Sequence, residues 1–195
     1  MVVDLVPAAR ADAGPPVVLV PGAGMAVKQW PHWRALARAL AERGRSALVV
    51  TGGRAPGAWA EEFARPLPPT GLRELAAVFA AVGERGGTVV GPDTGPVRMA
   101  AAVGTRTVGL FGPTAAARYG LGPAGVDLQG LPGCPHRRPT AIAEQVCWWD
   151  ARCPLAEDGP ACMRALTVAA VLRARHPADR PGTPMVTESS ARHCE

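Results

Sequence analysis

Residues 89–114 read VVGPDTGPVRMAAAVGTRTVGLFGPT, and this stretch decides the fold. It opens with an apolar run that predicts a β-strand and breaks at Pro92. Asp93, Thr94 and Gly95 then stand where an alanine-rich helix should begin. The first turn of a helix has free N–H groups and the positive end of the helix dipole. A hydroxyl group and a glycine at such a turn therefore indicate a site for a phosphate group.

A second loop of the same kind follows the next predicted strand. The apolar run Thr107–Phe111 stops at Gly112, Pro113 and Thr114. In a parallel sheet, the loops that follow the strands gather at one edge. Two small-residue loops at that edge predict a ligand that carries two phosphates.

The remainder of the chain alternates between strand and helix patterns. Apolar runs predict strands at 17–20, 46–50, 88–90 and 107–111. Apolar positions at helical spacing predict helices over 31–43, 71–82 and 162–175. We expect Pro31 in the first turn of the first of these helices, Thr70 as the cap of the second, and irregular structure over 112–160. This alternation predicts a parallel sheet with right-handed crossovers.

Composition limits the class of protein. A length of 195 residues fits one domain, and a hydrophobic content of 48% argues against disorder. The formal net charge of +5 comes from arginines spread along the chain, which gives no support to a nucleic-acid-binding face. No apolar run approaches the ~20 residues that span a bilayer, and the N-terminus lacks the pattern of a signal peptide. We expect a cytoplasmic chain that binds no nucleic acid.

The glycine loop after the first strand fits neither of two common nucleotide-binding motifs. Gly22 and Gly24 begin like a dinucleotide-binding fingerprint, but Val27 stands at the position of the third glycine. The loop also lacks the Gly-Lys-Ser/Thr ending of a P-loop. A nicotinamide-dependent enzyme and an ATPase of the P-loop type are therefore disfavoured.

Several motifs together resemble glycosyltransferase family 9, the lipopolysaccharide heptosyltransferases. They are PGAGMAVKQWP at 21–31, LRELA at 72–76, DTGP at 93–96, the alanines at 100–102, LFGPT at 110–114 and RYG at 118–120. The resemblance runs from about Val17 to about Val171. It implies an α/β fold with a Rossmann-like parallel sheet and helices on both faces, corresponding to the C-terminal half of a GT-B fold.

The resemblance also implies a domain organisation. Residues 1–15 are an N-terminal extension, and residues 16–175 form the nucleotide-sugar-binding domain. That domain carries an irregular insert rich in Cys and Trp at about 120–160. Residues 176–195, rich in Pro, Ser, Thr and charge, are predicted to be a disordered tail.

By resemblance, six residues are expected to bind the donor and its phosphates: Lys28, Asp93, Thr94, Gly95, Arg98 and Thr114. Each has a plainer interpretation. Lys28, the only lysine in the sequence, could be an exposed loop residue, Thr94 and Gly95 could form a helix cap, and Gly-Pro-Thr114 could be an ordinary turn.

The chain departs from the family pattern in three respects. Arg98 stands where these transferases usually have a histidine, although an arginine can still hold a phosphate. Arg54–Gly57 occupy the stretch where an acidic residue for the ribose is expected. No catalytic residue is assigned here, because the family's general base lies in an N-terminal domain that this sequence does not include.

The cysteines and two tryptophans leave alternatives open. The five cysteines lack any Cys-x2-Cys pair, so they could be reduced thiols or, with His136, a zinc site: Cys134, Cys147, Cys153, Cys162 and Cys194. Reduced thiols are the default in a cytoplasmic protein, and no metal or cofactor is expected. Trp148 and Trp149 could belong to the core or cover an interface with the missing domain.

The resemblance implies metal-independent, inverting transfer of a sugar from an ADP-sugar, with ADP-heptose as donor and lipopolysaccharide core as acceptor. The expected partners are therefore these two substrates and a separate N-terminal acceptor-domain chain, and the acceptor allows peripheral contact with a membrane. The main alternative is a non-catalytic ADP-binding module or the remnant of a split gene. A cysteine-ligated zinc domain is a third interpretation.

Overall fold

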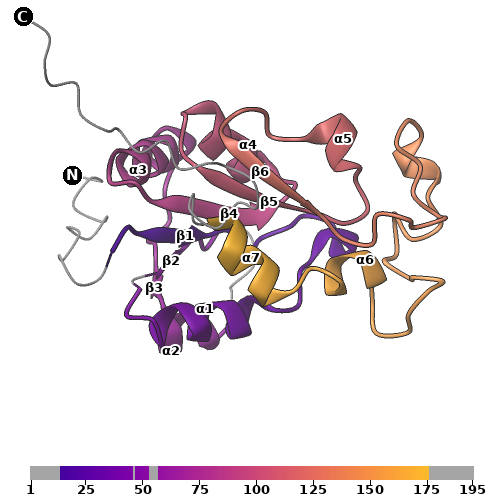
Figure 1. Ribbon diagram of the computed structural model, residues 1–195, viewed down its shortest axis with the longest axis horizontal. Coiled ribbons are helices and arrows are strands. Elements are labelled where there is room, and N and C mark those ends of the chain that lie inside the picture. The colour runs from indigo at the N-terminus through magenta and orange to yellow at the C-terminus, as the bar shows by residue number, and fades with distance from the viewer. Residues whose placement is uncertain (1–13, 46, 53–56, 176–195) are drawn as a thin grey trace, which may run out of the picture.

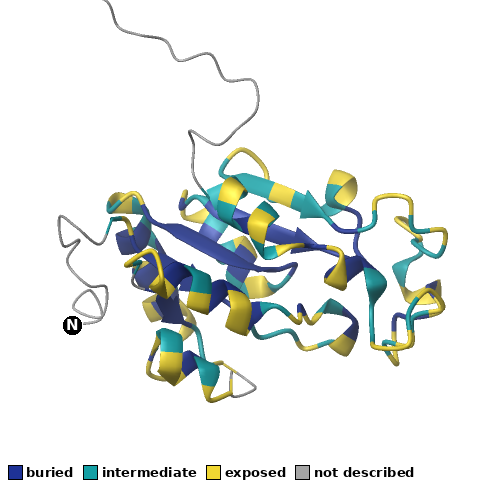
Figure 2. Ribbon diagram, turned by 60° about the horizontal axis from the view of Figure 1, so that its bottom comes forward, coloured by how far each residue is buried: buried dark blue, intermediate teal, exposed yellow. Residues whose placement is uncertain are grey.

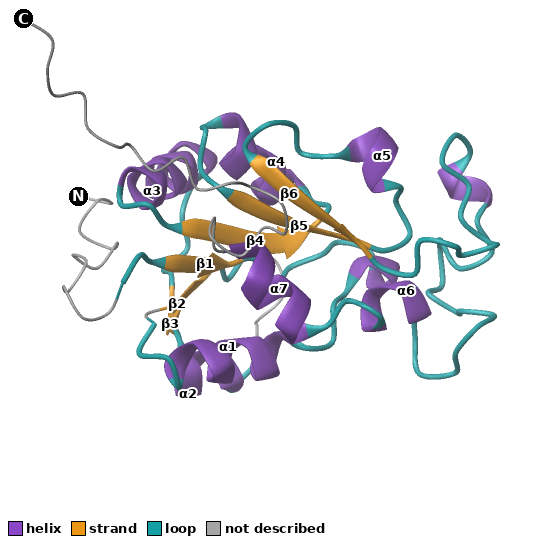
Figure 3. Ribbon diagram, in the orientation of Figure 1, coloured by secondary structure: helices purple, strands orange, loops and turns teal. Residues whose placement is uncertain are grey.

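The fold is a six-stranded parallel β-sheet with helices on both faces, as Figures 1 and 3 show. The computed structural model describes residues 14–45, 47–52 and 57–175. Its strands are β1 (Val17–Leu19), β2 (Ala47–Val49), β3 (Arg65–Pro66), β4 (Thr88–Pro92), β5 (Thr107–Phe111) and β6 (Gly125–Gln129). They lie in the order β3-β2-β1-β4-β5-β6. The predicted α/β class and parallel sheet are confirmed.

The helices form two layers around this sheet. One face carries α1 (Trp33–Ala41), α2 (Trp59–Phe63), α6 (Ala161–Arg164) and α7 (Val168–Arg175), and the other carries α3 (Leu72–Glu84) and α4 (Gly95–Ala102). Three shorter helices lie in the connections: η2 (Ala26–Lys28), α5 (Ala116–Tyr119) and η3 (Ile142–Glu144). None of the helices in the described part of the chain is long and apolar enough to cross a membrane.

Strands β1, β2, β4 and β5 are buried along their whole length because both faces of the sheet are covered there. Val17 and Leu19 of β1 pack into the cluster with α1 and α7, whereas Val18 and Val20 pack into the cluster with α3 and α4. Figure 2 shows β1, β4 and β5 as continuous buried ribbons. This is the pattern of a parallel sheet between two helical layers.

Two sequence predictions are confirmed in detail. Strand β5 has the predicted bounds, Thr107–Phe111. The apolar positions at helical spacing that predicted a helix over 31–43 form the buried face of α1, namely Trp33, Leu36, Ala37 and Leu40. Apolar periodicity therefore gave the correct helix orientation.

The predicted starts of two helices are wrong. Pro31 lies in the turn before α1, and His32 is the residue that precedes the helix. Thr70 does not cap α3, because the helix begins after Gly71, whose backbone N–H donates to the Glu74 carboxylate at 2.8 Å. That bond is the carboxylate half of a capping box, and glycine has no hydroxyl group to supply the other half.

The predicted irregular stretch after Gly112 is also wrong in part, because it contains α5 and the sixth strand, β6. Moreover, the single helix predicted over 162–175 is two helices, α6 and α7. Thr167 stands between them, and its hydroxyl accepts a hydrogen bond from Ala170 N at 3.2 Å. The predicted extension up to residue 13, the stretch 54–56 and the tail lie outside the described residues.

A close approach between β4 and α4 fixes the start of the phosphate loop. A Cβ atom at Gly91 would meet the side chain of Val97 on α4 and would lie 2.9 Å from Cβ of Val20. Only a glycine leaves room for the helix so near the strand. Gly91 therefore sets the position of the Asp93–Gly95 turn relative to the sheet.

We predict that Gly91→Ala lowers the free energy of unfolding by about 1–3 kcal/mol, because overpacked cores are strained by this amount. Gly133→Ala is the control, since a Cβ there would meet no atom within 4 Å. Chemical denaturation of both variants measures the difference. Equal stability of the two variants would show that β4 and α4 can separate without cost.

Candidate functional site

The candidate site lies at the carboxyl edge of the sheet, where the strand order reverses. Strand β1 pairs with β2 on one side and with β4 on the other, so the chain leaves β1 and β4 in opposite directions. Ligands of open α/β sheets bind in the crevice at such a point. The glycine loop after β1 and the Asp93–Gly95 turn after β4 face each other there.

Two adjoining cavities mark this crevice. One, of about 640 Å³, is lined by Gly22, Ala23, Gly24, Ala26, Gln29, Gly52, Thr94, Gly95 and Pro96. The other, of about 460 Å³, shares Gly22, Gly52 and Pro96 with the first. Its further lining is mostly apolar and includes Val50, Leu67, Leu72 and Leu75. The crevice thus has a small-residue part and an apolar part.

Lys28 and Asp93 form the polar centre of the site. The Lys28 ammonium group donates to the backbone oxygen of Asp93 at 2.9 Å and to its carboxylate at 3.3 Å. The Asp93 side chain is only 7% exposed and that of Lys28 only 17%. The predicted glycine-loop lysine is therefore a mostly buried ion-pair partner of the β4 turn, and its interpretation as an exposed loop residue is wrong.

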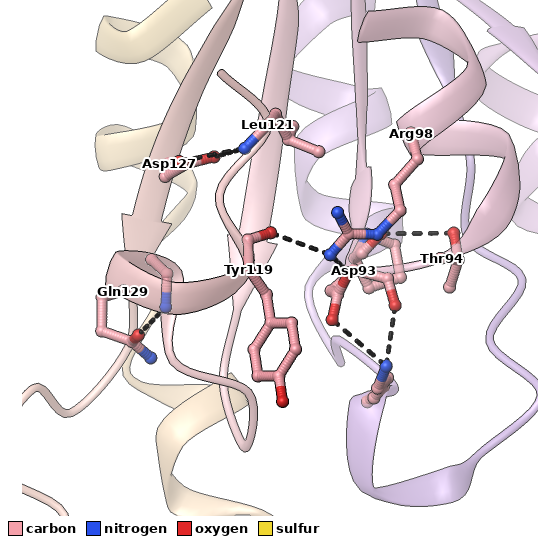
Figure 4. A network of polar contacts seen from close by, with 10 residues as sticks. Asp93, Thr94, Arg98, Tyr119, Leu121, Asp127 and Gln129 are labelled. Atoms are coloured by element: carbon pink, nitrogen blue, oxygen red, sulfur yellow. Dashed lines mark hydrogen bonds and ion pairs between the residues drawn. The ribbon is translucent and has the colours of Figure 1, made fainter. Parts of the chain in front are cut away.

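Arg98 is the second cation on Asp93. Its guanidinium group pairs with the other carboxylate oxygen of Asp93 and donates to the backbone oxygen of Tyr119 at 2.8 Å. Figure 4 shows Arg98 between Asp93 and Tyr119. The arginine that replaces the expected histidine thus links the β4 turn to α5.

Thr94 and Gly95 begin α4, as predicted, and both line the larger cavity. Thr94 precedes the helix in extended conformation, yet its hydroxyl makes no bond to the helix N–H groups and donates instead to the backbone oxygen of Pro92 at 3.2 Å. The cap interpretation of its side chain is therefore wrong. Gly95 is exposed, and a Cβ there would meet nothing within 4 Å.

Thr114 does not join this cluster. It is buried, lines neither of the two cavities, and its hydroxyl has no hydrogen-bond partner among the described residues. Gln129 on β6 holds the loop around it, since its amide donates to the oxygens of Phe111 and Gly112 and its carbonyl accepts from Ala116 N at 2.8 Å. Local sequence gave no signal for this role of Gln129.

Asp127 on β6 lies near Arg98 and accepts hydrogen bonds from Leu121 N at 3.2 Å (Figure 4). Burial raises the pKa of this carboxyl group, although the Leu121 N–H and the Arg98 charge act in the opposite direction. Asp127 therefore loses its proton at a higher pH than an exposed aspartate does.

A single arginine holds the start of the insert against β5. The Arg137 guanidinium group donates at 2.7–3.1 Å to the carbonyl oxygens of Gly112, Gly130, Leu131 and Pro132. These bonds fix the backbone after β6, where Leu131 has a positive φ of 45°. The sequence did not indicate this residue.

The insert packs onto the glycine loop. Cys147 and Trp148 are buried against Val27, whereas Trp149 is 76% exposed. Of the two alternatives for the tryptophans, Trp148 thus belongs to a small core. Burial raises the pKa of the Cys162 thiol to about 11, so it is un-ionised at neutral pH. Among the described residues, no three potential ligands gather as a metal site.

This arrangement defines a Rossmann-like α/β domain with a crevice at its switch point, and comparisons give the family. The model of glycosyltransferase family 9 (heptosyltransferase) matches residues 6–131. The chain belongs to glycosyltransferase family 9. It is 38% identical over 115 residues to lipopolysaccharide heptosyltransferase 1 of Pseudomonas aeruginosa, covering 54% of this chain and 31% of that protein.

Solved structures agree with this assignment. The E. coli heptosyltransferase WaaC with ADP is 27% identical, with a TM-score of 0.55 over 63% of this chain and 40% of that chain. The E. coli ADP-heptose lps heptosyltransferase II is 19% identical and shares the fold, with a TM-score of 0.57 over 85% of this chain and 46% of that chain. The chain therefore spans less than half the length of these relatives.

We predict that Asp93→Asn lowers the free energy of unfolding by about 1–3 kcal/mol, because two cations lose their charged partner while the side chain keeps its shape. Asp150→Asn is the matched control, since the Asp150 carboxylate pairs with Arg152 at 3.7 Å on the exposed surface. Its loss should lower the free energy of unfolding by less than ~0.5 kcal/mol. Urea denaturation compares them. A loss at Asp150 as large as that at Asp93 would contradict the central role of Asp93.

Proposed function

We propose that this chain is the donor-binding half of an inverting glycosyltransferase that transfers heptose from ADP-heptose to lipopolysaccharide core on the cytoplasmic side of the membrane. The observation that carries the proposal is the cluster of Lys28, Asp93 and Arg98 beside a cavity at the β1–β4 switch point. Two relatives support the donor and acceptor, namely the WaaC structure that contains ADP and the lipopolysaccharide heptosyltransferase of Pseudomonas aeruginosa.

The two parts of the crevice suit the two parts of the donor. The apolar cavity beside Val50, Leu67 and Leu75 accommodates the adenosine, since nucleosides are bound by apolar walls with few polar groups. The small-residue cavity beside Thr94 and Gly95 accommodates the diphosphate, because backbone approaches it closely there. Gly22 and Gly52 line both cavities, and their lack of side chains allows one ligand to extend from one cavity into the other.

The chemistry of the proposed site is stabilisation of the leaving group. When the sugar departs, negative charge grows on the diphosphate, and fixed positive groups lower the energy of that state. Lys28, Arg98 and the N-terminus of α4 supply such groups around Asp93. Deprotonation of the acceptor hydroxyl requires a base from an N-terminal acceptor domain.

A non-catalytic ADP-binding module is the second candidate function. The described residues contain the crevice and its cations, and nucleotide binding alone requires no more than these. Such a module would keep the crevice and its cations but would lack the acceptor-side base. The two candidates therefore agree on donor binding and differ only in turnover.

We predict that the domain binds ADP at least tenfold more tightly than AMP, because the second phosphate gains charge-assisted hydrogen bonds worth about 1.5–3 kcal/mol each. Lys28→Ala should weaken ADP binding at least tenfold, and Thr94→Val should weaken it less. Arg34→Ala is the control, since it removes the same charge from an exposed position on α1. Isothermal titration calorimetry measures all four proteins.

Equal affinity for ADP and AMP would contradict the proposed donor site. If Arg34→Ala weakens ADP binding as much as Lys28→Ala does, the proposed donor site is also contradicted, because the effect would then come from net charge alone.

A transfer assay separates the enzyme from the module. We expect no heptose transfer to a lipid A core acceptor by this chain alone, and transfer when an N-terminal half from a family 9 relative is added. Release of ADP, measured by mass spectrometry, reports the reaction. Transfer by the chain alone would overturn the half-enzyme proposal, and failure with several N-terminal halves would favour the module.

A further inference from the structure

The indole ring of Trp148 lies against the proposed phosphate-binding lysine. The Lys28 ammonium nitrogen is 5.5 Å from the centre of this ring. Trp148 is 7% exposed and comes from the insert, far from Lys28 in the sequence. The contact is within the distance at which an aromatic face attracts a cation.

Packing fixes the ring in this position. Trp148 and Cys147 form a small core with Val27, the residue before Lys28, and Met25 and Ile142 pack against it. The insert thus touches the glycine loop at the residue next to the lysine. Any displacement of the ring would open this core.

Backbone hydrogen bonds hold the segment that carries the ring. Trp148 N donates to the Gln145 oxygen at 2.9 Å, and the buried Gln145 side chain donates to the Ile142 oxygen at 3.0 Å. Ala151 N donates to the Cys147 oxygen at 3.0 Å, and Ala151 has a positive φ of 59°. A segment with this many internal bonds presents Trp148 as a fixed surface.

Resting on the proposed function, we propose that Trp148 is a positioning residue for the donor diphosphate. Its indole face holds the Lys28 ammonium group where the phosphates bind, so the insert forms part of the donor site. Trp148 acts through Lys28 and does not need to touch the nucleotide.

A neutral ring suits this task better than a second carboxylate would. Asp93 already contacts both Lys28 and Arg98, so these three side chains together carry a formal charge of +1. Another carboxylate would cancel that charge and compete with the phosphates. The aromatic face restrains the ammonium group without neutralising it.

Calorimetric titration with ADP tests the proposal. Trp148→Leu, which keeps apolar volume without an aromatic face, should raise the Kd by about three- to tenfold, and Trp148→Phe should give an intermediate Kd. Trp149→Leu is the matched control, because Trp149 is exposed and its indole N–H bonds to the Ala143 oxygen at 3.1 Å. In a Lys28→Ala background, Trp148→Leu should change the Kd by less than about twofold.

Nuclear magnetic resonance tests the contact without any ligand. Lys28 is the only lysine in the sequence, so protein labelled with ¹³C-lysine gives one ε-methylene signal. A ring face shifts the protons above it upfield from their position in an unstructured peptide. We expect that shift in the wild type and in Trp149→Leu, a smaller one in Trp148→Phe, and none in Trp148→Leu.

The outcomes separate this proposal from the proposed function. If the wild type binds no ADP, both fail. If Lys28→Ala weakens ADP binding while Trp148→Leu and Trp148→Phe match the wild type, only the role of Trp148 is overturned. An effect of Trp148→Leu that persists fully in the Lys28→Ala background, or an unshifted lysine signal in the wild type, also overturns it.

Discussion

The carboxylate of Asp93 is the interaction on which the rest of the site depends. It lies buried at the end of β4 and contacts Lys28 from the glycine loop and Arg98 from α4. These two cations come from opposite sides of the switch point. Because a buried carboxylate without partners is costly, both loops are held at the sheet edge by the need to satisfy it.

This arrangement lowers the positive charge of the site but fixes its two cationic side chains in place. Asp93 cancels one of the two positive charges, so the site attracts a phosphate less strongly than two free cations would. In return, Lys28 and Arg98 are fixed before a ligand arrives, and a pre-organised site loses less entropy on binding. The N-terminus of α4 and the face of Trp148 add attraction and restraint without adding an anion.

The sequence predicted those features that local patterns determine. Continuous apolar runs predicted β5 to the residue, and helical spacing predicted the buried face of α1. Strand β6 was missed because it is an edge strand with intermediate burial, so its apolar residues, Val126 and Leu128, make only a short alternation. Thr167 could have predicted the break between α6 and α7, because a hydroxyl residue is typical of a helix N-cap and Thr167 caps α7.

The sequence predicted the part of the candidate site that lies within one loop. It did not predict the contacts between residues that are far apart in the sequence. Asp93, Thr94 and Gly95 lie at the start of α4, as the local pattern indicated. Thr114 instead is buried, and Gln129 holds its loop from the next strand. No local pattern could bring Trp148 to Lys28, because most of the sheet lies between them in the chain and the insert that carries Trp148 is irregular.

A crystal structure of the domain with ADP tests the central claim most directly. We predict that the diphosphate lies at the β1–β4 switch point, with phosphate oxygens about 2.7–3.2 Å from the Lys28 ammonium group and from the N–H groups that begin α4. ADP bound away from Lys28 and Thr94, or a crevice that stays empty at saturating ADP, would contradict the account.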